Sequence, residues 1–142
     1  MKRLAALGGL VAIITLALGT AALARSLSAV DTAHLREVRT SGEAIVEEGR
    51  TTGALPGTIR ARLTINSTAF VTFTVYLKGG TISGQGSGKL KGNPADPSFG
   101  GTMRVTHGTG NYAHARGTGG FYGTLNRRTY AMIVQTTGSL HY

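Results

Sequence analysis

Carboxylates, the usual groups for general acid–base catalysis, are scarce in this chain, which has only six Asp and Glu residues in all. Three of them lie close together in a segment that indicates a strand less clearly than the later segments do. They are Glu43, Glu47 and Glu48. Glu43 and Glu47 would face the same side of that strand about 13 Å apart, too far for direct cooperation. We therefore interpret these carboxylates as solvated strand residues, with a general acid or base among them as the alternative.

The other residue types that could support catalysis or bind a metal do not form a recognisable site. A zinc site needs three or four ligands in one place, and no carboxylate lies near the pair of histidines that flank a glycine-rich turn. The four histidines are His34, His107, His114 and His141. The chain has no Cys, which excludes a thiol nucleophile and a disulfide scaffold. We expect no catalytic residues, no metal and no cofactor, and we lean toward a protein that is not an enzyme.

A serine hydrolase is excluded by the position of the sequence's best candidate nucleophile. Gly86-Ser87-Gly88 lies within a predicted strand, whereas a nucleophile elbow lies at a strand-to-helix turn.

Basic and aromatic side chains share the polar face of the predicted strands, and the net charge is +9. Such a face could bind an anionic cell-envelope polymer or a glycan, while ordinary solubilising charge is the alternative. Nucleic acid is a less favoured partner because no reader motif is present. The candidate ligand-binding residues are Arg62, Tyr76, Arg104, Tyr112, Arg116 and Tyr122.

The N-terminus has the three parts of a secretory signal peptide. Lys2 and Arg3 precede an uncharged run that ends in Ala22-Leu23-Ala24. We expect cleavage after Ala24 and a secreted or extracytoplasmic protein with no remaining membrane span. The rival interpretation is an uncleaved anchor, since about 20 apolar residues can cross a bilayer.

The rest of the chain predicts strands. Residues 25–39 are polar and mixed, so we leave the structure of this N-terminal arm open, and we assign residues 40–142 to one β domain. Apolar and polar residues alternate with a period of two from Thr58 to Leu140, with breaks such as Lys78-Gly79-Gly80 and the loop Lys91–Pro97. Short turns between seven to eight strands are typical of an antiparallel sandwich or barrel. We favour a closed up-and-down barrel, because glycines on one face permit the bending that closure needs.

The apolar face of these strands alternates glycines with large side chains, and we expect it to point inward. The glycines would let Phe73, Phe99 and Phe121 pack against bare backbone and form a solid core. They would otherwise leave a pocket for a small apolar ligand. We favour the solid core, because proteins seldom contain large dry voids. The glycines are Gly84, Gly86, Gly88, Gly101, Gly117, Gly119 and Gly123.

A glycine-rich turn follows the strand that begins near Phe99. Gly108-Thr109-Gly110-Asn111-Tyr112-Ala113 matches the G-x-G-x-x-A pattern of dinucleotide-binding turns. However, the glycines from Gly117 onward would not sustain the helix that such a turn must open. We predict positive-φ glycines and then a one-turn helix over Asn111–Ala115.

The run from Gly108 to Gly117 also resembles the Gly-Thr-Gly-x-aromatic-x-x-Ala-x-Gly signature of the allene oxide cyclase and dirigent-type barrels. The resemblance covers Phe99–Tyr142, about a third of the chain, and His107 replaces a glycine that is frequent there. It implies an eight-stranded barrel of calycin type. In that family the barrel holds a polyunsaturated epoxide or a radical-derived phenol near acidic and polar side chains. Those acidic residues cannot be matched here, so no catalytic residue is carried over.

Two functions remain open. The first is an exported, non-catalytic barrel that binds an anionic cell-envelope polymer on its basic face or a small apolar molecule inside. The second is a cofactor-independent enzyme, similar to these cyclases or dirigent proteins, that steers an apolar substrate within the barrel.

Overall fold

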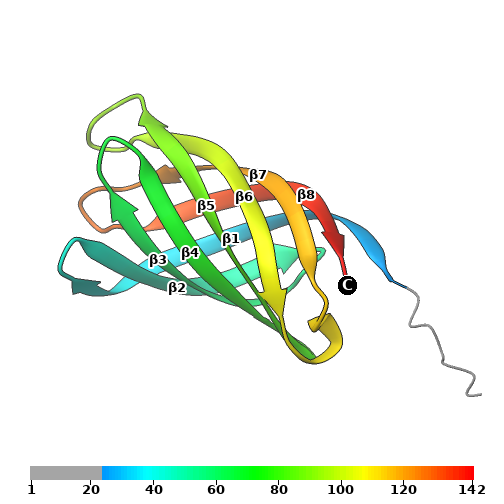
Figure 1. Ribbon diagram of the computed structural model, residues 1–142. Helices are drawn as coiled ribbons and strands as arrows, with labels where there is room; N and C mark the ends of the chain where they lie inside the picture. Colours follow the sequence, from blue (N-terminus) through cyan, green and yellow to red (C-terminus); the bar gives the residue numbers. More distant parts are fainter. Residues whose placement is uncertain (1–23) are drawn as a thin grey trace, which may run out of the picture.

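The computed structural model describes residues 24–142, which form one closed antiparallel barrel (Figure 1). Each strand pairs with the next along the chain, and the last pairs with the first. This confirms the predicted all-β class and the closed up-and-down topology, with eight strands. They are β1 (Ser26–Ser41), β2 (Ala44–Gly53), β3 (Gly57–Ile65), β4 (Ala69–Leu77), β5 (Gly80–Lys91), β6 (Ser98–Gly108), β7 (Arg116–Leu125) and β8 (Met132–His141).

The segment whose structure the sequence left open is a full strand of the barrel. β1 spans Ser26–Ser41 and pairs with β2 on one side and with β8 on the other. The residues predicted as an N-terminal arm therefore close the sheet. The predicted signal peptide, apart from its last residue Ala24, lies outside the described residues. No helix in the described part of the chain is long and apolar enough to span a membrane.

The two-residue period separates an inner from an outer face on each strand. In β3, Ala61 and Leu63 are buried inside the barrel, whereas Arg60 and Arg62 are exposed on its outer wall. Alternation along β3 thus places an aliphatic layer inside and basic side chains outside.

The inward glycines provide a surface against which aromatic rings pack. A Cβ atom built on Gly84 would lie 2.8 Å from Cζ of Phe73, and one on Gly123 would lie 2.7 Å from Cζ of Phe99. Phe121 approaches Gly86 in the same way, at 3.0 Å. The predicted packing of the phenylalanines against bare backbone is confirmed, and the rings lie along the barrel wall.

One end of the barrel is covered by the glycine-rich connection between β6 and β7. It contains a short 3-10 helix, η1 (Gly110–Tyr112), where the sequence predicted one helical turn. Gly110 has a φ of +58°, and a Cβ there would lie 2.2 Å from the carbonyl oxygen of Gly79, so this position requires glycine. Ala115 is fully buried and the Tyr112 ring packs on Tyr142, with centroids 4.9 Å apart. These side chains form an apolar plug.

Candidate functional site

The interior of the barrel contains a cavity of about 150 Å³, lined by residues from all eight strands. The expectation of a solid core is therefore wrong. The physical reason is the packing of Phe73, Phe99 and Phe121 along the glycine-rich wall, which leaves the centre of the barrel unfilled. Most of the lining side chains are apolar, including Leu63, Met103 and Val134.

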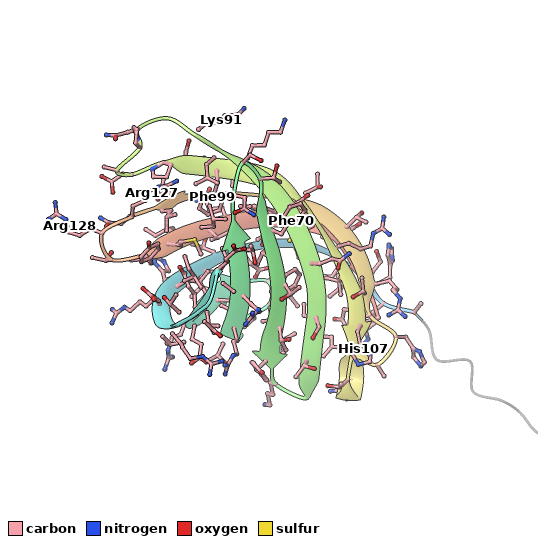
Figure 2. The ribbon with its side chains drawn as sticks, turned by 60° about the vertical axis from the view of Figure 1, so that its left-hand side comes forward. Phe70, Lys91, Phe99, His107, Arg127 and Arg128 are labelled. Atoms are coloured by element: carbon pink, nitrogen blue, oxygen red, sulfur yellow. The ribbon has the colours of Figure 1, made fainter. Side chains whose placement is uncertain are left out.

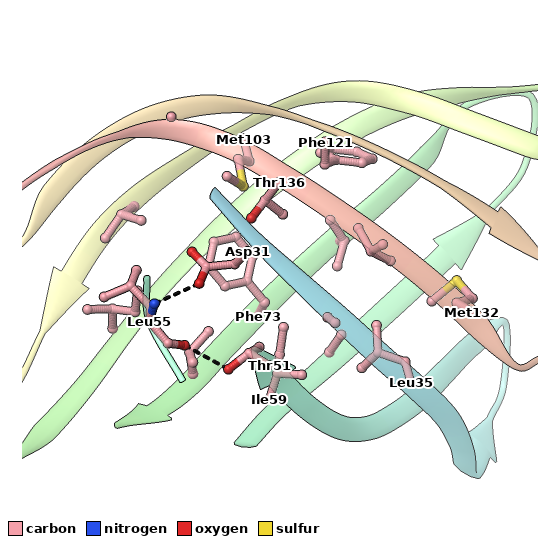
Figure 3. A pocket seen from close by; sticks show the side chains of 18 of the residues that line it. Asp31, Leu35, Thr51, Leu55, Ile59, Phe73, Met103, Phe121, Met132 and Thr136 are labelled. Atoms are coloured by element: carbon pink, nitrogen blue, oxygen red, sulfur yellow. Dashed lines mark hydrogen bonds between the residues drawn. The ribbon is translucent and has the colours of Figure 1, made fainter. Parts of the chain in front are cut away.

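Of the five polar residues that line the cavity, Thr118 and Ser139 are exposed, and the other three lie close together on β1 and its two neighbours, β2 and β8 (Figure 3). Asp31 and Thr136 are direct partners across β1 and β8, and Thr51 lies on the neighbouring strand β2. The carboxyl of Asp31 and the hydroxyls of Thr51 and Thr136 provide the cavity with a polar corner. An apolar space with a few convergent polar groups is the usual form of a small-molecule site.

The loop between β2 and β3 holds this polar corner in place. The backbone N–H of Leu55 donates to Oδ1 of Asp31 at 2.6 Å, and the Thr51 hydroxyl donates to the Leu55 carbonyl at 2.8 Å. Figure 3 shows both bonds converging on Leu55. Because Leu55 also contributes to the cavity lining, the loop fixes the carboxyl and forms part of the wall.

Asp31 is a buried carboxyl, with 8% of its surface exposed. Burial raises its pKa above the ordinary value, and the backbone N–H groups of Leu55 and Ala54 offset part of that effect. The group can accept a hydrogen bond from a ligand when ionised and donate one when protonated.

Asp31 is not among the predicted site residues, because the sequence left the structure of residues 25–39 open. A signal was present, since Leu27, Ala29, Asp31, Ala33 and Leu35 keep a strict two-residue alternation. Had this stretch been interpreted as a strand, its single carboxylate would have been placed on the apolar face.

The carboxylates that the sequence did single out behave differently from one another. Glu48 is solvated as expected and pairs with Arg60 at 3.0 Å, both side chains being about half exposed. Glu47 contradicts the expectation of a solvated residue, because it faces the interior with 1% of its surface exposed. The alternation along β2 accounts for this difference, since adjacent residues of a strand point to opposite faces.

Glu47 faces the interior but is not among the residues that line the cavity. Its atom Oε2 has no hydrogen-bond partner among the described residues. Its pKa is raised to about 8, mainly by burial and to a smaller extent by the negative charge of Glu37. Glu37 is its direct partner on β1, beside a bulge in that strand. A buried carboxyl of this kind is protonated at neutral pH.

The candidate ligand-binding residues do not form one site. Tyr76 and Tyr122 are exposed on the outer wall, and Arg116 is exposed and donates to the carbonyl of Ala115 at 2.6 Å. Tyr112 belongs to the apolar plug. Of these six residues, only Arg62 and Arg104 line the same groove, which lies on the outer wall.

The histidines are also dispersed. His34, His107, His114 and His141 are all exposed. Within residues 24–142 no group of three or more His, Asp or Glu side chains could hold a metal ion.

In comparisons with protein-family models, with curated proteins and with solved structures, nothing matches this chain. Its function must therefore be inferred from the geometry of the barrel.

Proposed function

We propose that this protein is an exported barrel that binds a small apolar molecule in its interior. The observation that carries the proposal is the cavity of about 150 Å³, which is lined almost entirely by apolar side chains and contains one buried carboxyl, Asp31. Removing an apolar ligand from water into such a space is favourable by about 25 cal/mol per Å² of buried apolar surface.

The size of the cavity limits the ligand. A dry cavity of about 150 Å³ holds a molecule the size of benzene, whereas sites for drug-sized ligands usually measure about 300–1,000 Å³. A single ring or a short branched chain fits the interior of this barrel, and a long acyl chain does not.

The polar corner limits which polar groups the ligand can carry. A ligand hydroxyl placed beside Asp31 would donate to the carboxylate, or accept from the carboxyl when that group is protonated. Hydrogen bonds to charged groups contribute about 1.5–3 kcal/mol, more than neutral ones. We therefore expect a small apolar alcohol or phenol to bind better than the corresponding hydrocarbon.

Export through a signal peptide with cleavage after Ala24 remains part of this proposal. The basic n-region, the apolar run and the Ala22-Leu23-Ala24 end support it. The intact mass of the secreted protein tests it, and a mass that includes Met1–Ala24 would refute cleavage.

The binding test compares toluene with p-cresol by thermal unfolding. A ligand at 100 times its dissociation constant stabilises a fold by about 2.7 kcal/mol, which should raise Tm by roughly 10 °C for a domain of this size. We expect both compounds to raise Tm, with p-cresol effective at lower concentration. An unchanged Tm with both compounds would contradict the proposal.

A matched pair of variants locates the bound ligand. Val134 lines the cavity, whereas its neighbour Ile133 is 48% exposed on the outer wall. Val134→Phe should fill part of the cavity and abolish the stabilisation by toluene, and Ile133→Phe should leave it intact. Equal responses of the two variants would place the ligand elsewhere.

A second candidate function is supported by Asp31 itself. A carboxyl with a raised pKa inside an apolar cavity can act as a general acid or base. The Gly108–Gly117 motif resembles that of allene oxide cyclase and dirigent-type barrels, so a cofactor-independent cyclase or coupling enzyme is the alternative.

Incubation with a small unsaturated epoxide distinguishes the two functions. Unchanged recovery of the epoxide supports binding alone, and conversion that Asp31→Asn abolishes would favour the enzyme.

A further inference from the structure

The outer wall of the barrel carries a groove of about 840 Å³ that crosses β3 to β7. Short polar side chains, including Thr72, Ser87 and Thr102, contribute to its lining. Longer side chains also line it, among them Arg62, Arg104 and Phe70, which is 57% exposed. Figure 2 labels Phe70 on this wall.

The strand register aligns the two arginines of the groove. Arg62 pairs with Thr72, Thr72 with Gln85, and Gln85 with Arg104, on four successive strands. The arginines therefore lie in one row, about 14 Å apart along the sheet. An amide and a hydroxyl lie between them.

The distribution of charge favours an anionic occupant. From Gly57 to the C-terminus the chain has nine Lys and Arg residues and a single acidic residue, Asp96. Among residues 24–142 the one ion pair joins Arg60 and Glu48, so Arg62 and Arg104 have no carboxylate partner there. Unpaired guanidinium groups in a hollow suit carboxylates and other planar anions.

The surface beside the groove is flatter than the fold requires. Gly120 lies on the outer face of β7, next to Thr102 of β6. A Cβ on Gly120 would come no closer than 3.5 Å to any neighbour, and the same holds for Gly100 on β6. Packing does not demand these glycines, and glycine in a strand interior can mark the close approach of a ligand.

We propose that this groove binds a linear acidic polysaccharide. The hydroxyl and amide groups between the arginines would hydrogen-bond sugar hydroxyls. The two arginines would pair with carboxylates along the polysaccharide, and Phe70 would contact a sugar ring. A single-stranded nucleic acid fits less well, because its binding sites present successive aromatic side chains for base stacking. Among the described residues that line the groove, Phe70 is the one aromatic residue. This site lies outside the cavity and is independent of the proposed function.

The experiment measures retention of the full chain on immobilised polygalacturonate. We expect binding that weakens as salt is raised, because exposed charges are screened, and no binding to neutral dextran. Arg62→Gln combined with Arg104→Gln should lower the affinity at least tenfold. The matched control is Arg127→Gln with Arg128→Gln, which removes the same charge from the distant β7–β8 loop (Figure 2) and should retain most of the affinity.

Several results would overturn the proposal. Equal losses in the two double variants would show unspecific attraction by net charge, and equal or tighter binding of a single-stranded DNA oligomer would assign the groove to nucleic acid. Absence of binding to polygalacturonate would overturn it as well. A charge-neutral variant, Gly120→Leu, should obstruct the groove without disturbing the fold, and undiminished binding in that variant would also count against the site.

Discussion

The buried Glu47 makes stability depend on pH in an unusual direction. Its pKa is about 8 in the folded barrel, against 4.5 for an exposed glutamate. The folded state therefore keeps a proton that the unfolded chain releases above pH 4.5. The contribution of protonated Glu47 to the free energy of unfolding is fully present below pH 4.5 and is lost as the pH rises through 8. We expect the protein to be more stable at pH 5 than at pH 8.

The difference in pKa sets the size of this effect. Each unit of pKa difference corresponds to 1.36 kcal/mol, so ionising Glu47 inside the fold costs on the order of 5 kcal/mol. Domains are stable by only about 5–15 kcal/mol in total. Most of the loss should fall between pH 5 and pH 8. Asp31, whose pKa is also raised, contributes in the same direction.

The assay is urea unfolding at a series of pH values, comparing the natural chain with Glu47→Gln. The glutamine cannot ionise, so the two proteins should have similar stability near pH 5, and the variant should be the more stable by several kcal/mol near pH 8. Glu37→Gln should reduce the pH dependence in part, because the charge of Glu37 contributes to the raised pKa of Glu47.

Glu48→Gln serves as the control, because Glu48 is about half exposed and paired with Arg60. Exposed ion pairs contribute about 0–1 kcal/mol, so this variant should follow the natural chain closely at every pH. A difference between the natural chain and Glu47→Gln that stayed constant from pH 5 to pH 8 would refute the reasoning.

Further predictions concern the glycines and the polar corner. Gly84→Ala should destabilise the barrel by about 1–3 kcal/mol in urea unfolding, because its Cβ would lie 2.1 Å from the Arg104 carbonyl oxygen and 2.8 Å from the Phe73 ring. Gly120→Ala, whose Cβ meets nothing within 3.4 Å, should leave stability unchanged or raise it by up to about 1 kcal/mol; an equal loss in both variants would contradict the packing described. Asp31→Asn should reduce the preference for p-cresol over toluene about tenfold in thermal-shift titrations, and an unchanged preference would mean that the ligand does not reach the polar corner.

The barrel itself could be predicted from the sequence because its signals are local. Alternation along each strand and the glycines on one face specify strands that bend and an inner surface of apolar residues. The glycine-rich turn could be predicted for the same reason, since Gly110 lies where only glycine fits beside Gly79.

The cavity and its polar corner could not be derived in the same way, because they depend on contacts between distant strands. Whether Phe121 fills the barrel or lies along the wall is decided by Gly86 on another strand. Alternation places Glu47 and Glu48 on opposite faces of β2, but the pairing of β2 with its neighbours decides which of the two faces inward. The carboxyl of Asp31 is held in place by a hydrogen bond from the backbone N–H of Leu55, 24 residues away in the chain.

The central claim is that a small apolar molecule enters the barrel, and methyl NMR tests it most directly. Two of the three methionines, Met103 and Met132, line the cavity, so their labelled methyl groups report on its occupancy. Addition of toluene should shift both methyl signals to saturation and produce nuclear Overhauser contacts with the toluene ring. Methyl signals that stay unchanged up to the solubility limit of toluene would contradict the account.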